Sequence, residues 1–171
     1  MKVLDTERLV LRHIEPGDDG FILELLNEPG WLHHIGDRGI RTREAAREYI
    51  RNGPAAMVER LGFGLYLVER KADAASLGIC GLVRRDGLDD VDIGFAFLAR
   101  HGGCGYAFES ACAVMAYAKE VLGLGRIVAI TTTDNHPSIR LLERIGLRLE
   151  RMVTLPGDDE AVQLFANQGP F

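Results

Sequence analysis

The sequence has no long hydrophobic run, no excess of basic residues and no apolar stretch near its start. Its apolar runs stay well short of the ~20 residues that a transmembrane helix needs. Residues 1–15, MKVLDTERLVLRHIE, spread charges among their apolar positions and contain no signal-peptide core. The formal net charge is −5, whereas a nucleic-acid-binding face is usually basic. We therefore expect a cytoplasmic protein with neither a membrane nor a nucleic-acid partner.

Cysteine is also scarce. The three residues, Cys80, Cys104 and Cys112, are odd in number and lack paired spacing, so a disulfide framework is not expected. His101 and Cys104 form one candidate pair of metal ligands, but no second pair accompanies them, and we predict no metal. A catalytic thiol at Cys104 remains an alternative, because a helix N-terminus lowers the pKa of a thiol.

What the sequence does contain is a mixed pattern of strands and helices. At 171 residues, with no linker or repeat, the chain is expected to form a single domain over residues 1–171. Alternating and apolar runs predict seven strands. Helical periodicity in 17–28, cap and stop residues around two further segments and an alanine-rich stretch predict four helices, with residues 29–41 irregular and a break at Pro54. The strands are expected at 8–14, 63–70, 76–85, 91–98, 125–132, 148–155 and 160–167, and the helices at 17–28, 42–62, 104–121 and 133–146.

This order, β-α-α-β-β-β-α-β-α-β-β, predicts an α/β (α+β) fold with a mostly antiparallel sheet of about seven strands flanked by about four helices. It differs from the regular βαβ repeat of a dinucleotide-binding fold.

The stretch 99–107, ARHGGCGYA, is the most unusual segment. It lies between an apolar strand and an alanine-rich helix, so its backbone N–H groups and the helix dipole can together bind phosphate. No GK[ST] follows, and Phe108 stands where a G-x-G-x-x-G pattern would need its third glycine. The loop therefore does not indicate nucleotide hydrolysis or dinucleotide binding, and a plain tight turn remains the alternative.

Several motifs together resemble one family. They are R-x-x-G-x-G at Arg100, Gly103 and Gly105, the preceding strand DIGFAFL, and N-x-x-S-x-x-x-L-E-x-x-G over 135–146. In this order they resemble the GNAT superfamily of acyl-CoA-dependent N-acetyltransferases. The opening TERLVLR (6–12) is similar to the RimJ/RimL-like branch, which is typified by ribosomal-protein-alanine acetyltransferases.

The resemblance implies acetyl-CoA as the acyl donor. Phe97 and Leu98 would hold the pantetheine amides, the N–H groups from Gly103 to Ala107 would bind the pyrophosphate, and Ser138 would lie near the thioester. The residues implied to contact the cofactor are Phe97, Leu98, Arg100, Gly102, Gly103, Cys104, Gly105, Tyr106, Ala107, Asn135 and Ser138.

The sequence departs from the branch in two places. The loop reads HGGCG where Tyr-Trp-Gly-Lys-Gly is common, so a cation beside the phosphates is lost. The tyrosine general acid that many members place near Leu142 is also missing. Asn135 has an alternative role as a helix N-cap.

The resemblance implies direct transfer of the acetyl group to a primary amine on a protein N-terminus or a small molecule. Asp92 is our candidate base, with an ion-pair partner for an arginine as the alternative. Trp31, His33 and His34 are expected to line the acceptor pocket. A homodimer is common in the superfamily.

Two other functions stay open: an acyl-CoA-binding sensor without turnover, and a thioesterase-like hydrolase that uses Cys104.

Overall fold

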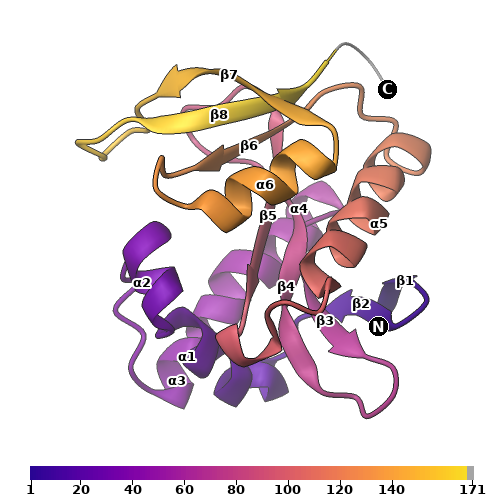
Figure 1. Ribbon diagram of the computed structural model, residues 1–171. Helices are drawn as coiled ribbons and strands as arrows, with labels where there is room; N and C mark the ends of the chain where they lie inside the picture. The colour runs from indigo at the N-terminus through magenta and orange to yellow at the C-terminus, as the bar shows by residue number, and fades with distance from the viewer. Residues whose placement is uncertain (169–171) are drawn as a thin grey trace.

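Eight strands form one mixed sheet in the order β1-β2-β3-β4-β5-β6-β8-β7. The computed structural model describes residues 1–168 (Figure 1). All neighbouring strands are antiparallel except β5 and β6, which are parallel. The strands are β1 (Lys2–Asp5), β2 (Leu9–His13), β3 (Leu65–Arg70), β4 (Ser76–Val83), β5 (Val91–Phe97), β6 (Ile127–Thr131), β7 (Leu147–Val153) and β8 (Val162–Asn167).

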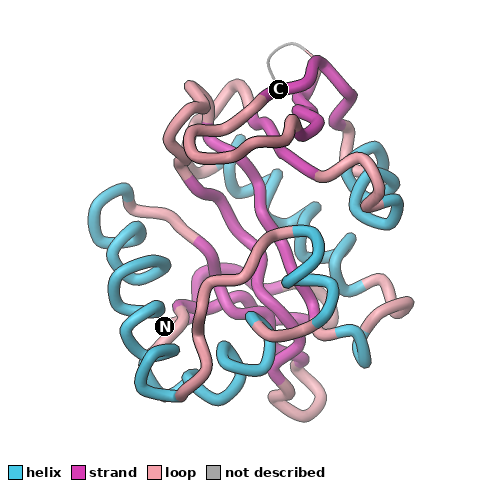
Figure 2. The backbone as a smooth tube through the Cα atoms, turned by 90° about the vertical axis from the view of Figure 1, so that its left-hand side faces the viewer, coloured by secondary structure: helices cyan, strands magenta, loops and turns pink. Residues whose placement is uncertain are grey.

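Helices cover both faces of this sheet, as Figure 2 shows. The longest, α5, packs on one face, while α1, α2 and α3 pack on the other. α1, α3 and α5 each bury an apolar stripe, whereas α2 buries Trp31 alone. Within residues 1–168, no helix is long and apolar enough to span a bilayer. The helices are α1 (Asp19–Leu26), α2 (Pro29–His34), α3 (Arg43–Ile50), α4 (Ala56–Leu61), α5 (Tyr106–Glu120) and α6 (His136–Arg144).

The parallel pair of β5 and β6 is only two residues long. Val91 lies opposite Ile127, and Asp92 lies opposite Val128. Beyond these positions β5 stays paired with β4 as far as Phe97, whereas β6 pairs with β8. Figure 1 shows the two strands diverging, with α6 beside the opening. The free edge of β5 therefore has backbone groups available to a ligand.

The predicted fold class is confirmed, with eight strands in place of about seven. The N-terminal segment differs from the prediction of one strand over 8–14, because β1 forms a hairpin with β2. β1 is four residues long and partly exposed, so it shows too little apolar periodicity to be recognised.

The prediction of an irregular segment over 29–41 was wrong in part, because Pro29–His34 forms α2. Pro29 occupies the first helical turn, where its fixed φ suits the helix and its missing N–H has no partner to lose. Trp31, only 6% exposed, anchors this short helix to the core.

The predicted interruption at Pro54 is confirmed. Thr42 caps α3 by accepting a hydrogen bond from Ala45 N at 3.0 Å. The helical path then passes through a π-helical turn, Arg51–Ala55, before α4 begins. A proline inside a helix lacks the N–H for the regular ladder, which accounts for the altered turn.

Gly81 in β4 provides a test of the packing between β4 and the start of β3. A Cβ at this position would lie 2.1 Å from the carbonyl oxygen of Gly64 and 2.8 Å from Leu65 Cα, both rigid backbone atoms. Gly81→Ala is therefore expected to lower the free energy of unfolding by ~1–3 kcal/mol. Urea unfolding followed by circular dichroism measures this change.

Gly125→Ala is the matched control, because nothing lies within 4 Å of a Cβ built there. It should change the free energy of unfolding by less than about 0.5 kcal/mol. Equal losses in the two variants would contradict the close approach of β3 and β4 at Gly81.

Candidate functional site

Two cavities adjoin the opening between β5 and β6. The first, which we call the inner cavity, has a volume of about 260 Å³, and the second, the loop cavity, of about 490 Å³. Neighbouring residues of β5 line one cavity and then the other: Ala96 lines the inner cavity and Phe97 the loop cavity. On α6, Ser138 lines the inner cavity and Arg140 the loop cavity. The cavities thus meet between β5 and α6.

The glycine-rich stretch forms one wall of the loop cavity. Gly103 and Gly105 have φ values of +77° and +82°, a conformation that residues with a Cβ rarely adopt. Nothing lies within 4 Å of a Cβ built at Gly103, so the backbone there is open to a ligand. Gly105 is the N-cap of α5, and the first N–H groups of this helix have no partner within the helix.

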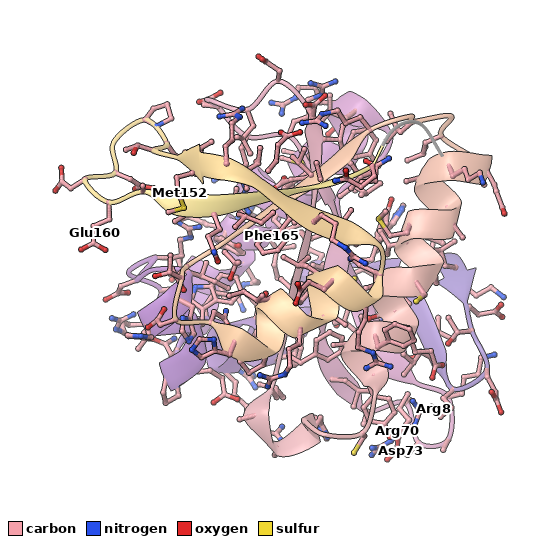
Figure 3. The ribbon with its side chains drawn as sticks, turned by 45° about the horizontal axis from the view of Figure 1, so that its top comes forward. Arg8, Arg70, Asp73, Met152, Glu160 and Phe165 are labelled. Atoms are coloured by element: carbon pink, nitrogen blue, oxygen red, sulfur yellow. The ribbon has the colours of Figure 1, made fainter. Side chains whose placement is uncertain are left out.

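Arginines from other elements supply positive charge around this loop. Arg140 and Arg144 of α6 line the loop cavity. Arg8 stacks its guanidinium 4.6 Å from the centre of the Tyr106 ring and is held by Glu109, whose Oε1 accepts from Arg8 Nε at 2.7 Å. Figure 3 shows Arg8 and Arg70 together near the start of α5.

These arginines were not among the site residues predicted from the sequence. Arg140 and Arg144 are four residues apart, so both lie on one face of α6, and this spacing was the available signal. The loop sequence HGGCG contains no lysine or arginine. The positive charge beside this loop is supplied by Arg140 and Arg144 of the neighbouring helix α6.

Three residues of the predicted cofactor set do not line either cavity: Leu98, Arg100 and Cys104. Arg100 forms an ion pair with Glu24 of α1. The N–H of Leu98 donates to the carbonyl oxygen of Leu77 at 3.0 Å. Because backbone groups alternate along a strand, those of Phe97 face the free edge.

The Cys104 side chain is exposed. All three cysteines are free thiols.

Asp92 lies at the last paired position of β5 and is only 1% exposed. Its Oδ2 accepts a hydrogen bond from Arg85 Nε at 2.8 Å, so the predicted alternative of an arginine partner is present. Burial raises the pKa of Asp92 to about 6, although the Arg85 guanidinium opposes this shift. No atom of residues 1–168 donates to Asp92 Oδ1. The carboxylate lines the inner cavity and can exchange a proton near neutral pH.

Two of the three residues predicted for the acceptor pocket, Trp31 and His34, line the inner cavity. His33 is exposed and lies outside it. His33 Nε2 is 2.7 Å from Asp134 Oδ2, and this hydrogen bond lowers the pKa of Asp134 to about 2. His34 Nδ1 is 2.9 Å from Thr132 Oγ1. The two histidines thus connect α2 to the segment between β6 and α6.

His33, His34 and Asp134 could each offer a ligand atom to a metal ion, and these atoms lie within 4.8 Å of one another. The hydrogen bond between His33 and Asp134 and the 3.5 Å approach of His34 Nδ1 to Asp134 Oδ1 account for this spacing.

Asn135 and Ser138 also line the inner cavity, at the N-terminal end of α6. The Asn135 side chain accepts a hydrogen bond from Ser138 N at 3.4 Å. The alternative role of Asn135 as an N-cap is therefore confirmed, and the cap fixes Ser138 at the boundary between the cavities.

Comparisons with known proteins agree with this architecture. Residues 8–148 match the Acetyltransferase (GNAT) domain. YkkB of Bacillus subtilis is 30% identical over 153 residues, which cover 88% of this chain and 87% of YkkB. YoaA, named as an N-acetyltransferase of Bacillus subtilis, is 29% identical over 150 residues, covering 86% of this chain and 84% of YoaA.

Among solved structures, the complex of coenzyme A with RimL, a ribosomal L7/L12 α-N-protein acetyltransferase, has a similar fold. The TM-score is 0.82 at 19% identity, with 98% of this chain and 97% of RimL covered. Because the family match spans most of the chain and includes the diverging strands and the glycine-rich loop, the chain belongs to the GNAT acetyltransferase family.

Proposed function

We propose that the protein is an acetyl-CoA-dependent N-acetyltransferase of the RimJ/RimL-like branch that acetylates a primary amine directly. One observation carries this proposal: the free edge of β5 leads from an open glycine-rich loop to a buried carboxylate. Family membership supports acyl transfer, and RimL, which shares the fold, has been solved with coenzyme A.

The residues present fit acetyl-CoA, which supplies an acetyl group activated as a thioester. The N–H groups from Gly103 to Ala107 would bind the pyrophosphate, because the space beside Gly103 is open and oriented backbone donors bind phosphate. Arg140 and Arg144 would add charge-assisted contacts. The backbone of Phe97 would pair with the pantetheine amides, and Ser138 would lie by the thioester.

Asp92 is the proposed base. It would take up the proton that the amine nitrogen loses, directly or through one water, as nitrogen bonds to the acetyl carbon and the carbon–sulfur bond breaks. The electron pair of that bond leaves on sulfur. A thiol has a pKa near ~8.5, so this leaving group needs no dedicated acid, and the missing tyrosine near Leu142 does not prevent the reaction.

The proposed setting is the cytoplasm, because the three free thiols suit a reducing compartment.

The direct test is release of free thiol from acetyl-CoA in the presence and absence of amines. Transfer requires that thiol appear only with an acceptor, together with the acetylated product by mass spectrometry. Cys104→Ala should keep kcat/KM within about twofold, because Cys104 lines neither cavity. Release without an acceptor that is lost in Cys104→Ala would instead show a hydrolase. Binding of acetyl-CoA without any release would show a sensor.

The arginines of α6 should contribute to cofactor affinity. Each of Arg140→Gln and Arg144→Gln is expected to raise the Kd for coenzyme A ~10-fold, since a hydrogen bond to a charged group contributes about 1.5–3 kcal/mol. Isothermal titration calorimetry measures this change. Arg151→Gln is the control, because Arg151 on β7 lines neither cavity. An unchanged Kd in a variant that carries both Arg140→Gln and Arg144→Gln would show that the backbone alone binds the phosphates.

The pH dependence of the rate should report on Asp92. Its pKa is raised from 3.8 to about 6 by burial, so the carboxylate is protonated and inactive as a base below about pH 6. The ratio of kcat/KM for wild type over Asp92→Asn should therefore fall as the pH drops through 6. Above that pH it should reach ~10²–10⁴. Stopped assays from pH 5 to about 9 provide the profile.

Arg85→Gln separates a base from a merely structural carboxylate. The Arg85 guanidinium lowers the pKa of Asp92, so its removal should move the acidic limb of the profile to higher pH. If the ratio of kcat/KM for wild type over Asp92→Asn is the same at every pH, Asp92 is not the base.

A further inference from the structure

The inner cavity carries positive charge although the protein is acidic. The chain has a formal net charge of −5, yet three arginines line this cavity: Arg38, Arg84 and Arg85. Asp92 is the only carboxylate among the lining residues, and it already pairs with Arg85. Arg38 and Arg84 therefore add two positive charges that no lining side chain offsets.

Neither of these guanidinium groups forms an ion pair within residues 1–168. Arg84 Nη1 donates to the backbone carbonyl of Asp89 at 3.0 Å. The other N–H groups of the Arg84 guanidinium remain available to a ligand. Arg38 and Arg84 both have exposed side chains, and they come from the segment after α2 and from the end of β4. An arginine fork with unused donors suits a carboxylate or a phosphate.

Trp31 points independently to an acceptor atom on the ligand. The residue is 6% exposed and lines the inner cavity. No atom of the described chain accepts a hydrogen bond from its buried Nε1. An indole N–H only donates, so a bound group with a lone pair would satisfy it.

The rest of the lining limits the size and polarity of the ligand. Much of it is apolar or aromatic, including Ile35, Tyr49, Met57 and Phe95. The volume of about 260 Å³ lies just below the range of roughly 300–1,000 Å³ that is usual for ligand pockets, and the thioester would share it near Ser138. The remaining space suits one small molecule with an apolar side chain.

We propose that the acceptor is a small primary amine that carries an anionic group beside an apolar side chain, the chemistry of an α-amino acid such as leucine. This inference rests on the N-acetyltransferase function proposed above. The anionic group lies against Arg38, Arg84 and the indole N–H of Trp31, and the amine faces Asp92. A polyamine would instead place its positive charges beside Arg38 and Arg84. The only carboxylate in the cavity lining, Asp92, is already paired with Arg85 and could not offset them.

The test compares four acceptors that share the leucine side chain and differ in the anionic group, with a polyamine as a fifth acceptor. The set is L-leucine, L-leucinamide, isoamylamine, the aminophosphonate analogue of leucine, and spermidine, each assayed with acetyl-CoA. We expect kcat/KM for leucine to exceed that for leucinamide and isoamylamine by ~10-fold or more. Leucinamide is the demanding comparison, because its amine is neutral more often than that of leucine and would react faster if charge recognition were absent.

The aminophosphonate identifies the anion. A kcat/KM near that of leucine supports recognition by charge alone, and a much lower one assigns the site to carboxylates. A higher value assigns it to phosphate-like groups.

Variants link this preference to the arginines. The double variant Arg38→Gln/Arg84→Gln should lower the ratio of kcat/KM for leucine over isoamylamine ~10-fold. Arg60→Gln should keep the wild-type ratio, because Arg60 is an exposed residue of α4 that lines neither cavity.

A binding measurement without turnover gives a second reading. Trp31 is the only tryptophan in the sequence, so intrinsic fluorescence reports directly on the inner cavity. N-acetylleucine should bind ~10-fold more tightly than N-acetylleucinamide, and the double variant should lose this difference.

Two results would overturn the inference while leaving the N-acetyltransferase function intact. One is equal or better use of isoamylamine, leucinamide or spermidine. The other is acetylation of protein N-termini but of none of these small amines. Failure of the proposed function looks different: acetyl-CoA would give no acceptor-dependent thiol release with any amine or peptide.

Discussion

The short contact between β5 and β6 is the constraint on which the site depends. Only two residue pairs join these strands, and beyond them each strand continues with a different neighbour. An unpaired strand edge is unfavourable in a sheet, because backbone N–H and C=O groups need partners. Here the same edge is the wall between two cavities. The sheet thus leaves backbone groups of β5 for a ligand that is itself rich in amides.

The position of Asp92 follows from that geometry. It is the last β5 residue that still pairs with β6, so both strands bury its side chain at the point where the opening begins. Burial raises its pKa, and the neighbouring Arg85 limits the rise. A carboxylate farther along β5, past the divergence, would have less burial and a lower pKa. The divergence of the strands therefore fixes both the place for the cofactor and the proton affinity of the proposed base.

Much of this arrangement could be predicted from the sequence, because it depends on local patterns. The glycines at 103 and 105, the N-cap at Asn135 and the break at Pro54 each follow from the conformational preferences of single residues. The helix α2 could not be predicted, since its six residues have little periodicity and its stability comes from burying Trp31. The pairing of Arg100 with Glu24 joins residues far apart in sequence, and no local pattern shows it.

The charges around the two cavities were the hardest feature to predict, and they connect the two halves of the site. The net charge of −5 describes the whole surface, whereas a ligand meets the field of the few groups that line its cavity. Arg140 and Arg144 face the loop cavity from α6, and Arg38 and Arg84 face the inner cavity from other elements. Each pair is brought to its cavity by the fold, and only the α6 pair has a recognisable spacing. Although the protein is acidic overall, arginines offer positive charge to an anion at both ends of the opening. The same electrostatic arrangement would then select a phosphate-bearing donor at one end and an anionic acceptor at the other.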